Sequence, residues 1–159
     1  MTIPRRLGLF LHEQKTVPTF VSVIENTDDR AGISGRGYSL LFAIIDGDDV
    51  GHEIEAHLLT NDVSGFVRTS ETISAAIELL ASHASRIAGV TVVSVGGDSI
   101  LLQVGENSIT RLSDELEALQ RPGHFTFSVG IGATLRESFI ALRMAKSSGK
   151  CRITSYSEL

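Results

Sequence analysis

The apolar run Tyr38-Ser-Leu-Leu-Phe-Ala-Ile-Ile45 is followed at once by the acidic stretch Asp46-Gly-Asp-Asp49. A run of this length and composition is typical of a β-strand that is buried on both faces. Asp46 stands where this strand is expected to end, so its carboxylate should emerge at the edge of the sheet. A helical pattern follows from Val50, and Asp48 or Asp49 is expected to cap that helix.

The elements after this strand define the fold class. The turn Gly96-Gly97-Asp98-Ser99 separates two short β-rich runs, which predicts a hairpin. Apolar residues recur at three- and four-residue steps in the later helices, and Thr134-Leu-Arg-Glu137 forms a capping box before the last one. The later helices are expected at residues 70–88, 108–120 and 134–148, and the later strands at 90–95, 100–104, 125–131 and 151–154.

The order β-α-α-β-β-α-β-α-β contains a βαββαβ core. The predicted fold class is therefore α+β, a ferredoxin-like palm whose antiparallel sheet carries its helices on one face. Residues 1–37 differ from the rest and end in a polar, glycine-rich run from Asn26 to Gly37. We expect them to form a flexible N-terminal extension, or to add an edge strand at residues 19–24, ahead of one folded domain over residues 38–159.

Composition narrows the class of protein. The chain has 159 residues, of which 42% are hydrophobic and 21% charged, and this suits one soluble globular domain. A net charge of −5 argues against a broad basic surface, so no stable nucleic acid partner is expected. No apolar run approaches the ~18–20 residues of a membrane span, and the lone Cys151 suits a reducing compartment. These features predict a cytoplasmic protein without membrane insertion.

Two acidic turns carry the main chemical signal. In the βαββαβ topology the first strand lies beside the central hairpin, so the carboxylates of Asp46 and Asp98 should meet at one end of the sheet. Two facing carboxylates repel each other without a cation, and Mg²⁺ or Mn²⁺ is bound by such hard oxygen ligands. Gly96 and Gly97 permit the tight turn and let a triphosphate approach the backbone. Gly-Gly-Asp alone is also an ordinary hairpin turn.

Other candidate residues are less specific. Lys146 and Lys150 flank Ser147-Ser148-Gly149 and could grip phosphates, although the dipole at a helix C-terminus favours cations by itself. Ser128 alternates with aromatic neighbours and could face a nucleotide. His52 and His57 are five residues apart, which does not fit a zinc-binding helix, so both are expected to face solvent.

Four segments in order resemble the minimal CRISPR polymerase family: Leu41-Phe-Ala-Ile-Ile-Asp46-Gly-Asp48-Asp-Val-Gly51, Gly96-Gly-Asp98-Ser-Ile-Leu-Leu102, Thr126-Phe-Ser128-Val-Gly130 and Ala145-Lys146-Ser-Ser-Gly149-Lys150. Members of this family are freestanding palm domains similar to the polymerase palm of type III CRISPR large subunits and to GGDEF diguanylate cyclases. The resemblance covers residues 38–154. It implies a nucleotidyltransferase that condenses nucleoside triphosphates into a cyclic oligonucleotide and releases pyrophosphate.

The resemblance also implies roles for single residues. Asp46 and Asp98 would be catalytic metal ligands, the Gly47 carbonyl a further ligand, and Lys146 and Lys150 triphosphate contacts. Asp48, Gly96 and Gly97 would line the nucleotide site. Ser128 resembles a serine that reads adenine, which favours ATP over GTP.

The resemblance further implies a biological setting. In bacterial anti-phage systems of this kind, a constantly made cyclic dinucleotide, such as cyclic di-AMP, restrains a membrane effector. Ring closure needs two nucleotides that meet head to tail, so a face-to-face homodimer is expected.

One departure from the family leaves alternatives open. The family's turn commonly reads Gly-Gly-Asp-Asp, and Ser99 here replaces the second acid. Asp48, Asp49 or a water held by Ser99 could compensate, or the protein could bind nucleotides as a sensor without catalysis. A palm-type GTP cyclohydrolase needs a similar metal-bound triphosphate. A haloacid-dehalogenase-like phosphatase would use Asp46 and Asp48 as nucleophile and acid, but it requires a doubly wound sheet.

Overall fold

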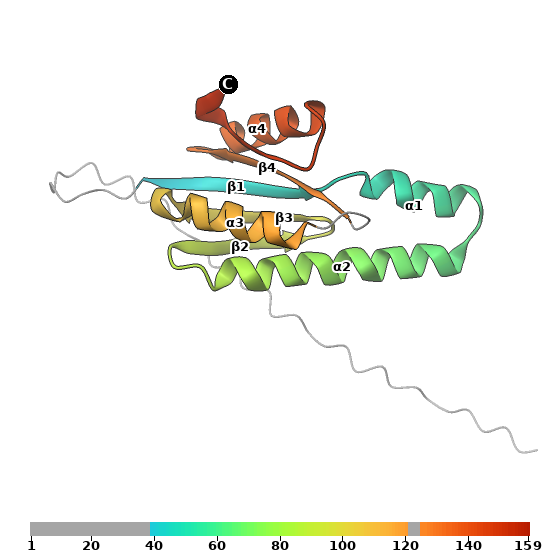
Figure 1. Ribbon diagram of the computed structural model, residues 1–159. Helices are drawn as coiled ribbons and strands as arrows, with labels where there is room; N and C mark the ends of the chain where they lie inside the picture. The colour runs from blue at the N-terminus through green and yellow to red at the C-terminus, as the bar shows by residue number, and fades with distance from the viewer. Residues whose placement is uncertain (1–38, 121–124) are drawn as a thin grey trace, which may run out of the picture.

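The computed structural model describes residues 39–120 and 125–159, which form a mixed α+β fold around a five-stranded sheet (Figure 1). The strand order is β2-β3-β1-β4-β5, in which β5 runs parallel to β4 and every other neighbouring pair is antiparallel. The strands are β1 (Leu40–Gly47), β2 (Val90–Gly96), β3 (Ser99–Gly105), β4 (Phe127–Gly132) and β5 (Ile153–Ser155). The predicted βαββαβ core is confirmed, while the predicted extension at residues 1–37 lies outside the described residues.

In the described residues, four α-helices connect the strands. They are α1 (Val50–Leu59), α2 (Val63–Ser85), α3 (Ile109–Leu119) and α4 (Leu135–Ser147), with 3₁₀ turns at Glu106–Ser108 and Tyr156–Glu158. None of the helices in the described ranges has both the length and the apolar character of a membrane span.

The prediction for α2 was wrong at its start, because the helix begins at Val63 rather than near Ser70. Its cap is Asp62, whose side chain accepts a hydrogen bond of 2.9 Å from the Gly65 amide. The first turns of α2 lie beside α1 and beyond the end of the sheet (Figure 1). Val63 and Val67 are therefore exposed, so this part of the helix shows no regular apolar stripe in the sequence.

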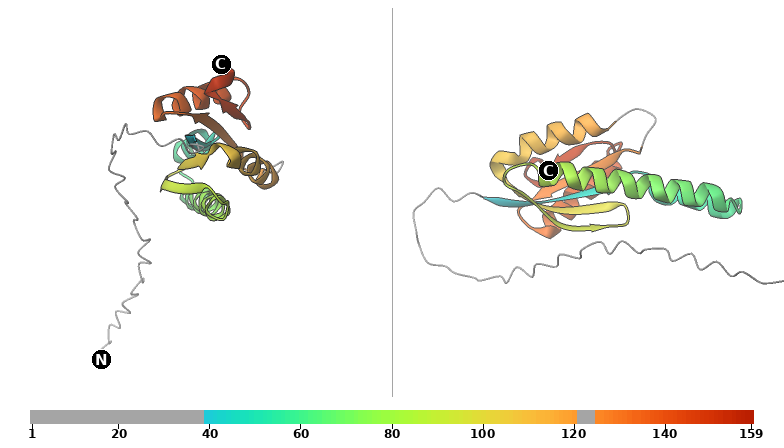
Figure 2. Two further views of the ribbon diagram at one scale, coloured as in Figure 1. Left: turned by 90° about the vertical axis from the view of Figure 1, so that its left-hand side faces the viewer. Right: turned by 90° about the horizontal axis from the view of Figure 1, so that it is seen from below.

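The two faces of the sheet are covered by different helices. One face packs on α2 and α3 to form the main core, which includes Ile45, Leu102, Ile77 and Leu112. The opposite face of β1 and β4 is covered by α4 (Figure 2). The expectation of helices on one face therefore holds for α2 and α3, whereas α4 lies on the other side.

Close packing of α4 depends on a glycine of β4. A Cβ on Gly130 would lie 2.1 Å from the carbonyl oxygen of Ser138 and 2.2 Å from the amide nitrogen of Leu142. Both atoms belong to the backbone of α4, so only glycine allows the helix to lie this near the strand. This approach brings the C-terminal turn of α4, which carries Lys146, to the end of β1.

Candidate active site

Asp46 and Asp98 lie at the same end of the sheet. Asp46 pairs with Ser99 of β3 on one side and with Ser128 of β4 on the other. The Gly47 amide donates a 2.9 Å hydrogen bond to the carbonyl oxygen of Asp98. A Cβ added to Gly47 would lie 3.4 Å from the Cβ of Asp98, so the hairpin turn directly adjoins the end of β1.

Lys146 reaches this end of the sheet from α4. Its Nζ lies 2.7 Å from Asp46 Oδ2, 2.7 Å from the carbonyl oxygen of Gly47 and 3.6 Å from Asp48 Oδ1. The ammonium group thus contacts the Asp46 side chain, which is predicted to bind a metal ion, and the Gly47 carbonyl group, for which the resemblance implies the same role. These oxygens form a site for a cation.

The donor set fits a hard divalent ion. Mg²⁺ is commonly held by one or two carboxylates together with substrate phosphates and waters. Within the described residues, no three His, Cys, Asp or Glu side chains cluster as a metal site, so the candidate ligands are two carboxylates and one carbonyl group. Asp46, Asp48 and Asp49 carry three formal negative charges in contact with the two lysines, which leaves an excess of one (3 − 2) before Asp98 is counted. Such an excess favours a bound cation.

Asp48 is buried, which the sequence did not predict. Only 4% of the residue is exposed, and its carboxylate accepts hydrogen bonds from Thr126 Oγ1 (2.8 Å), Ser128 Oγ (2.7 Å) and the Cys151 amide (2.9 Å). The predicted direct contact between Asp48 and a nucleotide does not fit this burial. The engaged carboxylate is likewise not free to replace the acid missing at Ser99.

Ser128 shares this buried network. Its side chain is fully buried, and its hydroxyl group donates to Asp48. In this conformation Ser128 presents no surface to a base, so the expected reading of adenine by this hydroxyl has no direct geometric basis. Ser128 lies beside Asp46 in the sheet, and its side chain faces Asp48 at the end of β1.

Asp49, which follows the buried Asp48, forms an ion pair with Lys150. The hydrogen bond from Lys150 lowers the pKa of Asp49 below its ordinary value of 3.8. Asp49 occupies the N-cap position of α1 with a left-handed φ of 60°, yet its side chain makes no capping hydrogen bond to the first turn of the helix. The expectation that Asp48 or Asp49 caps α1 by its side chain was therefore wrong.

The hairpin turn leaves its backbone open. Gly97 adopts a positive φ of 58°, and a Cβ added to Gly96 or Gly97 would meet no described atom within 4 Å. The hydroxyl group of Ser99 donates a 3.1 Å hydrogen bond to the Gly96 carbonyl within the turn. A phosphate or a ribose can therefore approach the turn without a steric conflict.

A cavity of about 310 Å³ adjoins Asp98 on the side of α1 and α2. The sequence did not predict this cavity, because it arises from the packing of α1 on the early turns of α2. Ser70 and Ser74, one helical turn apart on α2, supply its hydroxyl groups. Its lining residues are Val50, Gly51, Ile54, Ser70, Ile73, Ser74, Gly97 and Asp98.

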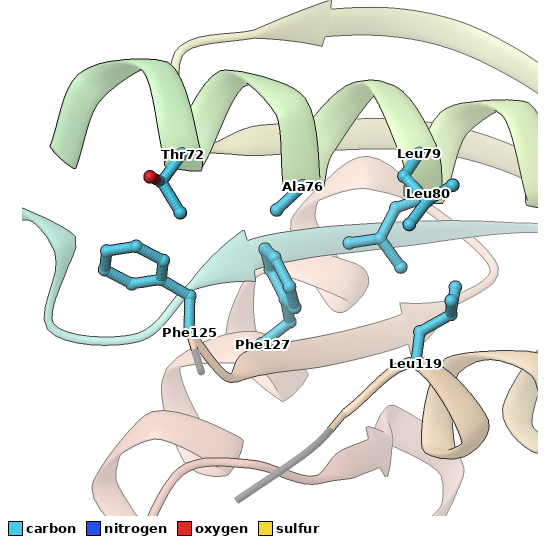
Figure 3. A pocket seen from close by; sticks show the side chains of 7 residues that line it. All are labelled: Thr72, Ala76, Leu79, Leu80, Leu119, Phe125 and Phe127. Carbon is cyan, nitrogen blue, oxygen red and sulfur yellow. The ribbon is translucent and has the colours of Figure 1, made fainter. Parts of the chain in front are cut away.

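A second cavity of about 300 Å³ lies on another side of α2 (Figure 3). The rings of Phe125 and Phe127 face the helix there, and Thr72 supplies a hydroxyl group. The other lining residues are Ala76, Leu79, Leu80 and Leu119. This apolar lining does not suit a triphosphate, which needs positive charge or amide donors.

His57 is only partly exposed, whereas the sequence led us to expect a solvent-facing residue. Its Nδ1 lies 3.2 Å from Asp62 Oδ2 and its Nε2 lies 3.0 Å from Thr69 Oγ1. These contacts tie the end of α1 to the start of α2. His52 is exposed, as expected.

The chain is similar to known proteins in sequence and in fold. The sequence model of the minimal CRISPR polymerase domain matches residues 42–156. Among curated proteins the sequence finds no match.

Similar solved structures share the fold at low sequence identity. An EAL/GGDEF domain protein from M. capsulatus has a TM-score of 0.56 and 20% identity, over 76% of this chain and 86% of that chain. The active GGEEF domain of a diguanylate cyclase from Vibrio cholerae has a TM-score of 0.54 and 20% identity, over 74% and 82%. A Csm1–Csm4 cassette in complex with one ATP has a TM-score of 0.54 and 18% identity, over 72% of this chain and 20% of that chain.

Proposed function

The chain belongs to the minimal CRISPR polymerase family, and from this premise we propose that it condenses nucleoside triphosphates into a cyclic oligonucleotide. The observation that carries the proposal is the cation site at the end of β1, where Asp46, the Gly47 carbonyl and the Asp98 turn adjoin one another. A cyclic dinucleotide such as cyclic di-AMP is the product that we favour.

Asp46, the Gly47 carbonyl group and Asp98 would hold Mg²⁺ or Mn²⁺. When bound, such an ion activates the attacking ribose hydroxyl group and offsets the charge that develops on the leaving pyrophosphate. The Lys146 ammonium group already contacts the Asp46 carboxylate where the divalent ion would bind. It must therefore move away from Asp46 when the ion binds. Its flexible four-carbon stem makes that movement possible.

The two lysines would then bind the triphosphate. Lys146 and Lys150 both contact carboxylates at the loop that joins β1 to α1. Phosphate oxygens offer the same charge-assisted hydrogen bonds. In the transition state the ammonium groups stabilise the charge on the β- and γ-phosphates while the α-phosphorus is attacked.

The cavity between α1 and α2 is the proposed base site. It adjoins Asp98 and combines apolar walls with the hydroxyl groups of Ser70 and Ser74. Ligand sites commonly have such a composition and volumes of about 300–1,000 Å³. ATP is the favoured substrate because the Csm1–Csm4 cassette of the same fold was solved in complex with one ATP.

Ring closure would require a second copy of the chain. The described part of each copy offers one cation site with its two lysines, whereas a cyclic dinucleotide needs two triphosphates that attack each other in turn. A face-to-face homodimer brings the two sites together with the fewest assumptions. The product would then act on a membrane effector in anti-phage signalling, without insertion of this chain into the membrane.

One alternative, a nucleotide sensor without turnover, is supported by a specific observation. Ser99 replaces an acidic residue of the family's turn, and Asp48 and Asp49 are engaged elsewhere. A nucleotide sensor without turnover would show these features. A GTP cyclohydrolase would open the purine ring, which changes the ultraviolet spectrum. The mainly antiparallel sheet contradicts a haloacid-dehalogenase-like phosphatase, which requires a doubly wound sheet.

To test this proposal, the full chain is incubated with Mg²⁺ and labelled ATP, either as the sole nucleotide or together with the other triphosphates. The products are identified by mass spectrometry. The wild type should form a cyclic product and pyrophosphate, and Asp46→Ala and Asp98→Ala should each abolish them. A cyclic product that persists in both variants would falsify the assignment of these residues. Tight ATP binding without any product would favour the sensor.

A further inference from the structure

The carboxylate of Asp48 connects three separate parts of the chain. Its Oδ1 accepts from Ser128 of β4 and lies 3.6 Å from Lys146 Nζ of α4. Its Oδ2 accepts from Thr126, which precedes β4, and from the amide of Cys151, which follows α4. The Asp48 amide in turn donates to the Thr126 carbonyl oxygen at 2.8 Å.

We infer that Asp48 is a positioning residue that holds Lys146 and Lys150 in place to bind the triphosphate. The inference rests on the proposed function, because it assumes that these lysines bind phosphates. Asp48 itself does not touch the nucleotide, since only 2% of its side chain is exposed and both of its oxygens are already engaged.

Lys150 depends on Asp48 through the backbone. The segment Gly149-Lys150-Cys151 has three consecutive positive φ values, 111°, 61° and 48°. Two of these residues are not glycine, and such residues rarely adopt this left-handed conformation unless their surroundings enforce it. The Lys150 amide is held by the Ala145 carbonyl at 3.1 Å, and the Cys151 amide by Asp48 at 2.9 Å. These two bonds fix the direction in which the Lys150 side chain leaves the turn.

Lys146 depends on Asp48 through charge. The ammonium group lies between Asp46 and Asp48, of which Asp46 is the more exposed. If Asp46 takes up a divalent ion, Lys146 loses that partner. Asp48 is buried and fixed by its other hydrogen bonds, so it keeps an attractive charge beside the ammonium group. Lys146 therefore remains close to the phosphates instead of turning to solvent.

This arrangement predicts an effect that is specific for the β- and γ-phosphates. AMP lacks these groups, so its binding should not depend on where the two lysines lie. The ratio of the dissociation constants of AMP and ATP therefore reports the position of the lysines. A general loss of structure would instead weaken both nucleotides together.

The experiment measures ATP and AMP binding to the full chain by isothermal titration calorimetry with Mg²⁺. In Asp48→Ala, ATP affinity should fall by about 10–100-fold, which corresponds to the loss of hydrogen bonds to a buried charge, while AMP affinity changes by less than about threefold. In Asp48→Asn, an acceptor for the Cys151 amide remains but the charge beside Lys146 is lost, so an intermediate effect is expected. Asp114→Ala removes an exposed carboxylate from α3 and should leave both affinities unchanged.

Two further variants keep the inference testable if Asp48→Ala fails to fold. Thr126→Val and Ser128→Ala each remove one hydroxyl group from the carboxylate, and each should lower the preference for ATP in the same direction. Equal losses for ATP and AMP, or an unchanged preference for ATP in the folded variants, would overturn the inference. Wild-type protein that prefers ATP but forms no cyclic product would contradict the proposed function alone.

Discussion

Gly130→Ala should separate α4 from the sheet. The new methyl group would lie 2.1 Å from the Ser138 carbonyl oxygen, 2.2 Å from the Leu142 amide nitrogen and 2.7 Å from the Leu142 Cα. Contacts of a Cβ below 3.0 Å are essentially never observed, so the helix must retreat by about 0.9 Å (3.0 − 2.1). Because all three atoms belong to the backbone, no side-chain rotation can relieve the conflict.

The cost follows from this displacement. Overpacking of this kind costs about 1–3 kcal/mol. Replacing glycine with alanine also restricts the unfolded chain, which offsets about 0.4–1 kcal/mol. We expect a net loss of about 1.3 kcal/mol (2 − 0.7 at the midpoints of these ranges), or a fall in Tm of about 4 °C at roughly 3 °C per kcal/mol. The ATP affinity should fall as well, because the retreat of α4 moves Lys146 away from the end of β1, where the triphosphate is proposed to bind.

The assay compares urea and thermal unfolding of Gly130→Ala with those of the wild type and of Gly51→Ala. Gly51 is the matched control, because it lies in α1 and an added Cβ would meet no described atom within 4 Å. Its replacement should raise stability by up to about 1 kcal/mol, since alanine has the higher helix propensity. If Gly130→Ala unfolds within about 0.5 kcal/mol of the wild type, α4 does not pack on β4 as described.

Two further predictions concern single hydrogen bonds. The hydrogen bond from the Gly65 amide lowers the pKa of Asp62 below 3.8, so this carboxylate stabilises the fold above pH 3.8, and the contribution is lost as the pH falls through the lower pKa of the folded state. Asp62→Asn keeps the helix cap but removes the titrating carboxyl group. The free energy of unfolding, measured with urea between about pH 2.5 and 6, should therefore depend less on pH than in the wild type. An unchanged pH dependence would disprove the contribution of Asp62. Ser138→Ala removes a buried hydroxyl group that bonds the Phe42 carbonyl at 3.0 Å, and should cost about 0.5–1.5 kcal/mol by urea unfolding. No measurable loss would mean that this bond adds no net stability.

The sequence predicts most of the fold because its signals are local. The apolar run before Asp46 and the glycine pair at residues 96 and 97 correspond to β1 and to the β2–β3 turn. The capping box at Thr134 is half confirmed: its hydroxyl group accepts from the Glu137 amide, but the Glu137 carboxylate accepts from Ala133 rather than from Thr134. The early start of α2 was missed because those turns pack on α1 instead of the core.

The sequence predicts only part of the candidate site, because some of its contacts join segments that are far apart in the chain. The approach of Asp98 to the end of β1 follows from strand order, which the element pattern reveals. The burial of Asp48 does not, because its partners Thr126 and Cys151 come from segments 78 and 103 residues away. Three of the four residues at 46–49 are aspartates. The sequence pattern does not distinguish the buried aspartate from the exposed ones.

The most direct test of the cation site is the effect of Mg²⁺ on the affinity for a non-hydrolysable ATP analogue. Wild-type protein should bind the analogue at least about tenfold more tightly with Mg²⁺ than without it, a difference of about 1.4 kcal/mol. Asp46→Asn and Asp98→Asn keep the size of the side chain and remove its charge, and each should abolish most of that gain. An equal gain from Mg²⁺ in the wild type and in both variants would contradict a divalent ion held between these two carboxylates.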